Sequence, residues 1–203
     1  CPAFFEACKK HGIVAVAGME LTTSEDIHAV CLFETLEAAM EFDREVDKKR
    51  IKIKNNVKVF GNQYILDSDD NIIGQEEYFL PIATKISLED VPSMVKAFNG
   101  VAYPAHIDRQ SNGLISILGT FPETPYFSCF ELRDSVNSKN YIDKYGLKDK
   151  RFVVSSDAMY HDFDCSVINE NYRIGQVPGM EVLAFPAEDT LIGYAFRAAE
   201  EVN

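Results

Sequence analysis

Three short apolar segments of this chain are each followed by a side chain that can bind a metal ion or transfer a proton. Glu20 follows the apolar residues 13–17, His106 follows 101–105, and Asp157 follows 152–155. Continuous apolar runs of this length are typical of strands buried on both faces, as in parallel sheets. Because the carboxyl ends of parallel strands meet at one edge of a sheet, we expect these three side chains to converge. Two carboxylates and an imidazole would suit zinc, manganese or iron.

Each of these residues also has an ordinary structural interpretation. A lone carboxylate at a strand end often caps a helix or is simply solvated. His28 stands eight residues after Glu20, at the head of the apolar residues 29–33. It is either a further metal ligand or an imidazole at the entrance of a strand. Asp157 lies in the polar stretch SSDAMYHDFD, where His161 is another candidate ligand.

Arg109 is the candidate for binding a substrate, because it lies three residues after His106. A guanidinium group can donate two parallel hydrogen bonds to a phosphate, so Arg109 would stabilise phosphoryl oxygens as a catalytic residue. A metal ion beside it would lower the pKa of its bound water to about 7 and so provide a nucleophile. The alternative is that Arg109 pairs with Asp108 or with another surface acid.

The composition is that of an ordinary globular protein with an acidic balance. The chain has 203 residues and 22.8 kDa, and its 20 Lys and Arg against 32 Asp and Glu give a net charge of −12. An acidic protein is a poor partner for nucleic acid or an anionic membrane, so neither is expected. No apolar run approaches the roughly 20 residues that a membrane-spanning helix needs. The oligomeric state is not indicated by the sequence.

The five cysteines indicate free thiols rather than a disulfide framework. Their number is odd, none has C-x-x-C spacing, and two of them lie inside apolar runs. These features favour a reducing compartment and therefore a cytoplasmic protein. The sequence opens with CPAFFEACKK and not with Met. We therefore expect a fragment, a processed chain or a rearranged one.

Alternating strand and helix patterns predict an α/β fold with a mainly parallel sheet. Apolar runs predict strands over 13–17, 29–33, 101–105, 126–132 and 151–155. Helical periodicity predicts helices over 2–11, 36–49, 88–98 and 140–145, and a polar turn at 67–71 predicts a strand pair within 57–73. The alternation is lost over the last forty residues.

Taken together, three segments of the chain resemble the PHP (polymerase and histidinol phosphatase) family of metal-dependent phosphoesterases. They are GMELTTSEDIHAVCLF, VAYPAHIDR and FVVSSDA, and they occur in the family's order within residues 1–160. The resemblance implies a distorted (β/α)7 TIM-like barrel that binds up to three divalent ions and hydrolyses a small phosphorylated substrate. It also implies that Glu20, His28, His106 and Asp157 are metal ligands, with Glu20 bridging two ions.

The chain departs from the family pattern at several positions. The family's opening H-x-H strand and its D-H pair do not precede the Glu20 segment, so the barrel would lack its first βα units. The last motif has Met159 where the family has histidine, and a thioether is a poor ligand for these ions unless His161 replaces it. Residues 161–203 would be a C-terminal extension or a rearranged segment.

Three hypotheses follow from these observations. The first is a PHP-type metal-dependent phosphoesterase, a hydrolase if its metal site is complete. The second is a non-catalytic PHP-like binding or regulatory module, which Met159 favours. The third is an unrelated acidic α/β domain whose polar residues at strand ends are structural, and this one predicts no metal binding.

Overall fold

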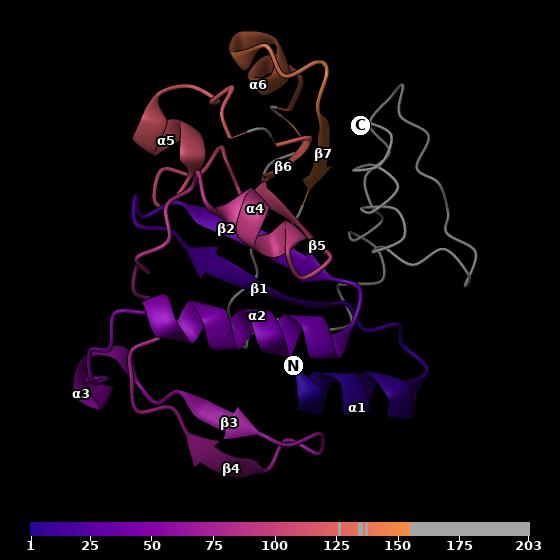
Figure 1. Cartoon of the computed structure of the whole chain (residues 1–203), viewed down its shortest axis with the longest axis vertical. Coiled ribbons are helices and arrows are strands. Elements are labelled where there is room, and N and C mark those ends of the chain that lie inside the picture. The colour runs from indigo at the N-terminus through magenta and orange to yellow at the C-terminus, as the bar shows by residue number, and fades with distance from the viewer. Residues whose placement is uncertain (126, 134–135, 137, 155–203) are drawn as a thin grey trace.

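The computed structural model describes residues 1–125, 127–133, 136 and 138–154 (Figure 1). This part of the chain has a mixed α/β fold, and its strands form three separate sheets. In chain order the elements are α1 (Pro2–His11), β1 (Ala17–Thr22), β2 (His28–Phe33), α2 (Leu36–Lys49), α3 (Val57–Phe60), β3 (Tyr64–Leu66), β4 (Ile72–Gln75), α4 (Val91–Lys96), β5 (Gly100–Pro104), α5 (Leu114–Leu118), β6 (Cys129–Leu132), α6 (Ser138–Tyr145) and β7 (Arg151–Val154).

The central sheet has three strands in the order β1–β2–β5. Strand β2 lies in the middle and pairs antiparallel with both neighbours. Along β2 the side chains alternate between half-buried and fully buried, because successive residues of a strand point to opposite faces of the sheet. The central sheet therefore has one face in a hydrophobic core and a second face that is less covered.

Helices α2 and α4 cover the buried face of the central sheet. The shared core consists of apolar side chains from the sheet and from both helices: Ala17, Leu21, Ala29, Cys31, Phe33, Ala39, Phe42, Val46, Ile86, Val91 and Val95. Most of these side chains are inaccessible to solvent. Burial of this apolar surface is what holds the sheet in its register.

Helix α2 has the bounds that the sequence predicted. It begins after Thr35, whose hydroxyl oxygen accepts a hydrogen bond from the N–H of Ala38 at 3.1 Å. This N-cap satisfies one of the free N–H groups of the first turn. Lys48 and Lys49 lie in the last turn, where positive charge interacts favourably with the helix dipole.

A second core lies around β6 and β7, the one parallel strand pair in the part of the chain that is described. Its buried residues are Ile27, Leu88, Ile107, Leu114, Ile115, Phe121, Phe127, Phe130, Leu132 and Leu147. The N–H of Ile107 donates to the carbonyl oxygen of Glu131 at 2.9 Å. This bond attaches the segment after β5 to strand β6.

The strand pairing of the central sheet differs from the prediction. A mainly parallel sheet was expected, but β1–β2 and β2–β5 are antiparallel. The strand expected over 13–17 is also wrong, since β1 begins at Ala17 and contains Glu20. Val30 and Leu32 are half-buried on the less covered face, so β2 is apolar on both faces. This gives the continuous apolar run that is otherwise typical of parallel strands.

The predicted (β/α)7 barrel is not tested by these residues. The three sheets described are not joined into a closed barrel. The remaining strands of such a barrel, and the predicted extension over 161–203, would involve residues outside the described ones. The barrel and the boundary at residue 160 therefore stay predictions.

Residues 51–80 form a separate lobe, which we call the hairpin lobe. Strands β3 and β4 pair antiparallel around the turn at 67–71, as predicted, but residues 57–60 form the short helix α3 instead of a strand. Figure 1 shows the lobe on the far side of α2 from the central sheet. The chain enters and leaves it where Arg50 and Thr84 form an isolated bridge.

Two further expectations can be compared with the described residues. None of the helices described there is long and apolar enough to cross a membrane. Cys1, Cys8, Cys31 and Cys129 are free thiols in the structure, and Cys8 and Cys31 are buried. Cys165 lies outside the described residues.

Phe42 provides a test of the core that supports the central sheet. Its side chain is fully buried, with its ring centroid 4.9 Å from that of Phe33 and 5.8 Å from that of Phe98. We expect Phe42→Ala to lower the free energy of unfolding by about 3–5 kcal/mol, as measured by urea denaturation. The exposed neighbour Glu41 gives the control, since Glu41→Ala should change it by less than about 0.5 kcal/mol. Equal effects of the two substitutions would contradict this packing.

Candidate metal centre

The register of the central sheet places Glu20 and His28 on the same face. Glu20 pairs with Val30, and Thr22 pairs with His28. Glu20 and His28 are therefore diagonal neighbours on adjacent strands, a spacing at which long side chains meet. Their face is the less covered one, opposite the core that includes Leu21 and Ala29.

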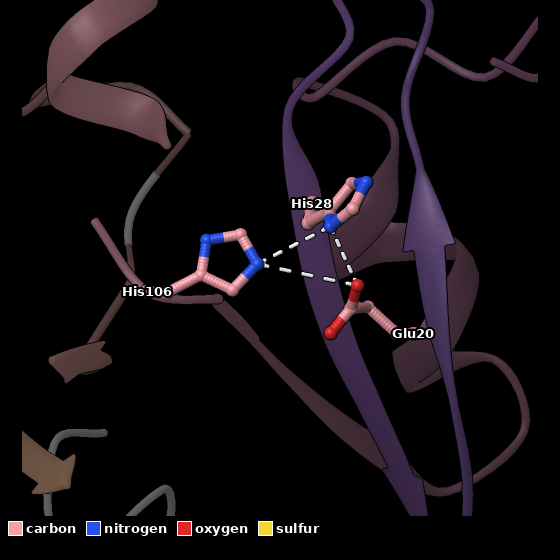
Figure 2. A group of neighbouring side chains, drawn as sticks. All are labelled: Glu20, His28 and His106. Carbon is pink, nitrogen blue, oxygen red and sulfur yellow. Dashed lines mark hydrogen bonds and ion pairs between the residues drawn. The ribbon is translucent and has the colours of Figure 1, made fainter. Parts of the chain in front are cut away.

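His106 reaches the same place from the other side of β2. Ala29 pairs with Pro104, and the N–H of Ala105 donates to the carbonyl oxygen of His28 at 3.0 Å. The end of β5 is thus aligned with the beginning of β2. His106 follows immediately, and its side chain points toward His28 and Glu20 (Figure 2).

The three side chains form a compact triangle of ligand atoms. His28 Nδ1 lies 2.5 Å from Glu20 Oε1 and 3.2 Å from His106 Nε2. His106 Nε2 lies 4.0 Å from Glu20 Oε1. One ligand atom from each of the three residues lies within 4.8 Å of the other two. Such a group of one carboxylate and two imidazoles is able to hold a single metal ion.

These donors and distances fit a transition metal ion. A tetrahedral ion with bonds of about 2.0–2.1 Å to nitrogen keeps its ligand atoms roughly 3.3 Å apart. The two imidazole nitrogens already have this separation. The distance between His28 Nδ1 and Glu20 Oε1, 2.5 Å, is shorter than this separation, and that between His106 Nε2 and Glu20 Oε1, 4.0 Å, is longer. Two imidazoles favour zinc, manganese or iron over calcium, which prefers oxygen ligands only.

The backbone around His106 is held tightly. His106 is 1% exposed and has a φ of 26°, a conformation that is uncommon for residues other than glycine. The backbone N–H of His106 donates a hydrogen bond to the buried carboxylate of Glu131 at 3.3 Å. Ala105 and Ile107, on either side, are fully buried. The imidazole of His106 is therefore presented from a rigid backbone.

The loop after His106 also fixes the backbone of His28. The carbonyl oxygen of Asn112 accepts the N–H of His28 at 3.0 Å, and the Asn112 side chain donates to the carbonyl oxygen of Asp26 at 3.1 Å. Gly113 follows, and a Cβ there would lie 2.1 Å from the carbonyl oxygen of Arg109. The loop 106–113 thus contains His106 and Arg109 and also binds the backbone of His28.

The electrostatics of the triangle favour an ionised Glu20. The hydrogen bond from His28 lowers the pKa of the Glu20 carboxyl group, and partial burial opposes this by a smaller amount. The charges of His28, His106 and Arg109 lower this pKa further. An ionised carboxylate is the form that binds a cation.

The structure brings together three of the four ligands expected from the sequence. Glu20, His28 and His106 form the triangle, and His28 faces the site although it stands at the entrance of its strand. Asp157, the fourth expected ligand, lies outside the described residues, as does His161. Whether Asp157 joins the site stays a prediction.

Glu131 is a residue near the site that the sequence analysis did not identify. It is a buried carboxylate in β6 and contacts the backbone of His106. The only signal in the sequence is a charged residue within the apolar stretch FSCFEL. Such a residue is seldom buried without a partner, but the sequence does not say which partner it has.

Comparisons with known proteins give little further information. No protein-family model matches the chain, and no curated protein matches its sequence. Among solved structures, the lesion-specific endonuclease PfuEndoQ from Pyrococcus furiosus is similar with a TM-score of 0.43 and 15% sequence identity. The match covers 70% of this chain and 30% of that chain. Likeness at this level does not establish a shared fold.

The contact between Glu131 and His106 leads to a prediction about metal affinity. Residues that orient metal ligands typically change affinity by about 10–100-fold when they are replaced. We expect Glu131→Ala to weaken binding of Zn²⁺ within this range in isothermal titration calorimetry, because the His106 backbone loses its acceptor. Glu131→Gln keeps an acceptor oxygen and should retain most of the affinity. Unchanged affinity in Glu131→Ala would show that Glu131 does not position His106.

Proposed function

We propose that this protein is a metal-dependent phosphoesterase of the PHP kind, which hydrolyses a phosphate ester with a metal-activated water. The observation that carries the proposal is the convergence of Glu20, His28 and His106 within 4.8 Å. Glu20 and His28 come from the consecutive strands β1 and β2, whereas His106 comes from a loop 78 residues after His28. The packing of the hydrophobic cores does not require the imidazoles of His28 and His106 to lie side by side. Their proximity to each other and to Glu20 therefore supports a metal site.

The residues of this chain would take separate parts in the reaction. Glu20, His28 and His106 would hold the ion through Oε1, Nδ1 and Nε2. A divalent ion bound there supplies a Lewis acid and lowers the pKa of a coordinated water to about 7. The guanidinium group of Arg109 would bind the phosphoryl oxygens and stabilise the negative charge that grows on them.

The motif order supports the same proposal. The segments that resemble the PHP family contain the three converging residues, and the third segment contributes Asp157 as a proposed fourth ligand. The proposal also includes a small phosphorylated substrate, a barrel of the PHP type over residues 1–160 and a cytoplasmic location. Zinc, manganese and iron all remain candidates for the ion, since the donor set suits each of them.

A second candidate is a metal-binding module without catalytic activity. The observation that favours it is Met159, which stands where the resemblance predicts a histidine ligand. A thioether binds these ions weakly, so a second or third ion would lack a strong ligand unless His161 replaces it. Such a module would bind one ion through Glu20, His28 and His106 and hydrolyse nothing.

Metal content provides the first test. We expect about one transition metal ion per chain when the protein is purified without chelator and measured by elemental mass spectrometry. Glu20→Gln and His106→Ala each remove one donor and should reduce the content at least tenfold. Glu41→Gln, an exposed substitution on α2, is the matched control and should retain the ion. A metal content at background in the unmodified protein would rule out the enzyme and leave a non-catalytic binding module, a fragment of a larger protein or the unrelated α/β domain.

Activity provides the second test, because it separates the enzyme from the metal-binding module. We expect the manganese-loaded protein to hydrolyse p-nitrophenyl phosphate or its diester analogue, and EDTA to abolish this activity. Arg109→Ala should lower kcat/KM by roughly 100-fold with the metal content unchanged, since one charged contact to the transition state is lost. Full metal loading with no hydrolysis of either ester would favour the non-catalytic module.

A further inference from the structure

The two histidines of the candidate metal centre differ in the surroundings of their second ring nitrogen. His106 is 1% exposed, and its second nitrogen, Nδ1, is buried. The side chain of His28 is 16% exposed. Figure 2 shows its second nitrogen, Nε2, on the edge of the ring that points away from Glu20 and His106. His28 Nε2 is therefore the second nitrogen that another molecule can approach.

The hydrogen bonds of His28 within the described residues all leave Nε2 unused. Nδ1 contacts Glu20 Oε1 and His106 Nε2, and the backbone of His28 binds Asn112 and Ala105. A histidine that holds a metal ion almost always donates its second N–H to an acceptor. For His28 that acceptor comes from outside the described residues, and a molecule bound at the exposed ring edge can supply it.

Metal binding decides whether Nε2 donates or accepts a hydrogen bond. A neutral imidazole carries one proton, either on Nδ1 or on Nε2. Without an ion, Nδ1 of His28 carries this proton, because it lies 2.5 Å from a carboxylate oxygen of Glu20 that needs a donor. With an ion bound at Nδ1, the neutral ring carries its proton on Nε2. Nε2 is then a hydrogen-bond donor on the exposed edge of the ring.

We propose that the Nε2–H group of His28 binds the substrate and donates to an oxygen in the alcohol part of the phosphate ester. This inference rests on the proposed function, because it requires an ion at Nδ1 and a phosphoryl group beside that ion. Nε2 lies across the ring from Nδ1, so the acceptor lies roughly 5 Å from Nδ1. The ion and Arg109 would hold the oxygens on phosphorus, and the acceptor is thus an oxygen beyond the ester bond.

The charges near His28 favour a neutral acceptor. Glu20 lies against the ring, and Asp26, two residues before His28, is at most about 7 Å away along the chain. Both carboxylates repel a second anionic group on the substrate. The substrate class is therefore a polyol phosphate, in which a hydroxyl group stands on the second or third carbon of the esterified alcohol.

The first measurement is the position of the ring proton in the zinc-loaded full chain. Two-bond ¹H–¹⁵N correlation NMR of protein labelled with ¹⁵N-histidine reports it without any need for activity. The signals that disappear in the His28→Asn variant are those of His28. We expect Nε2 to be protonated and Nδ1 to be bound to zinc. The reverse arrangement would overturn the proposal, because Nε2 would then have no proton to donate.

The second measurement is the affinity of the zinc-loaded protein for unreactive phosphonates, by isothermal titration calorimetry. 3-Hydroxypropylphosphonate and 4-hydroxybutylphosphonate carry the hydroxyl group, and butylphosphonate and pentylphosphonate have a methyl group in its place. We expect at least one hydroxyl compound to bind about fivefold more tightly than its methyl counterpart, the effect of one net hydrogen bond. The same compound should shift the signal of the His28 Nε2 proton. Equal affinities within both pairs would overturn the proposal.

His28→Asn is the variant that isolates Nε2. The side-chain oxygen of asparagine can replace Nδ1 as a ligand, but asparagine has no group at the position of Nε2. At saturating zinc this variant should lose the preference for the hydroxyl compound, and a preference that survives would overturn the proposal. Arg109→Ala is the matched control, since it should weaken both compounds of a pair alike and keep the preference. If His28→Asn does not hold zinc, the shift of the Nε2 proton signal in the unmodified protein decides.

The failure of this inference differs from the failure of the proposed function. A protein that binds no zinc would overturn both. A zinc-loaded protein that hydrolyses phosphate esters, but binds the hydroxyl and methyl compounds equally, would overturn the role of His28 Nε2 alone.

Discussion

The antiparallel register of β2 between β1 and β5 is the constraint on which the rest of the site depends. It makes Glu20 and His28 diagonal neighbours and brings the end of β5 to the beginning of β2. A shift of one residue in the β1–β2 pairing would move Glu20 to the core face, because side chains alternate along a strand. Apolar residues such as Phe33 and Ala29, buried on that core face, prevent such a shift.

The candidate metal centre lies where two hydrophobic cores approach each other. Ala29, next to His28, belongs to the core under α2 and α4, whereas Ile107, next to His106, belongs to the core around β6. Each histidine is thus fixed by a different core. Glu131 connects the second core to His106 through a direct hydrogen bond. Because both backbones are rigid, an ion would find its nitrogen ligands already at a suitable separation.

The two faces of the central sheet have different roles: one contributes to stability and the other carries the candidate metal centre. The face under α2 and α4 buries apolar side chains and supplies the free energy of folding. The other face is less covered and can therefore hold the charged and polar groups that a metal centre needs. The hairpin lobe lies outside this arrangement, since it contributes to neither core and exposes apolar side chains.

The sequence by itself determined the local features of this protein. Helix α2 follows from its apolar spacing, and the turn at 67–71 follows from its polar residues. Glu20 and His106 were predicted as metal ligands because they are a carboxylate and an imidazole that follow apolar segments, and His28 was predicted as a ligand by the resemblance to the PHP family. Arg109 was identified by the same kind of argument, from the chemistry of the guanidinium group.

Only the tertiary structure decided how these pieces meet. An apolar run predicts a buried strand but does not show whether the neighbouring strands run parallel or antiparallel to it. The parallel pairing predicted for the central sheet was therefore wrong. The face on which His28 lies depends on register, and register depends on the packing of residues distant in the sequence. The contact of Glu131 with His106, and the exposure of the hairpin lobe among the described residues, were likewise invisible in the sequence, because burial depends on which distant segments fold over a residue.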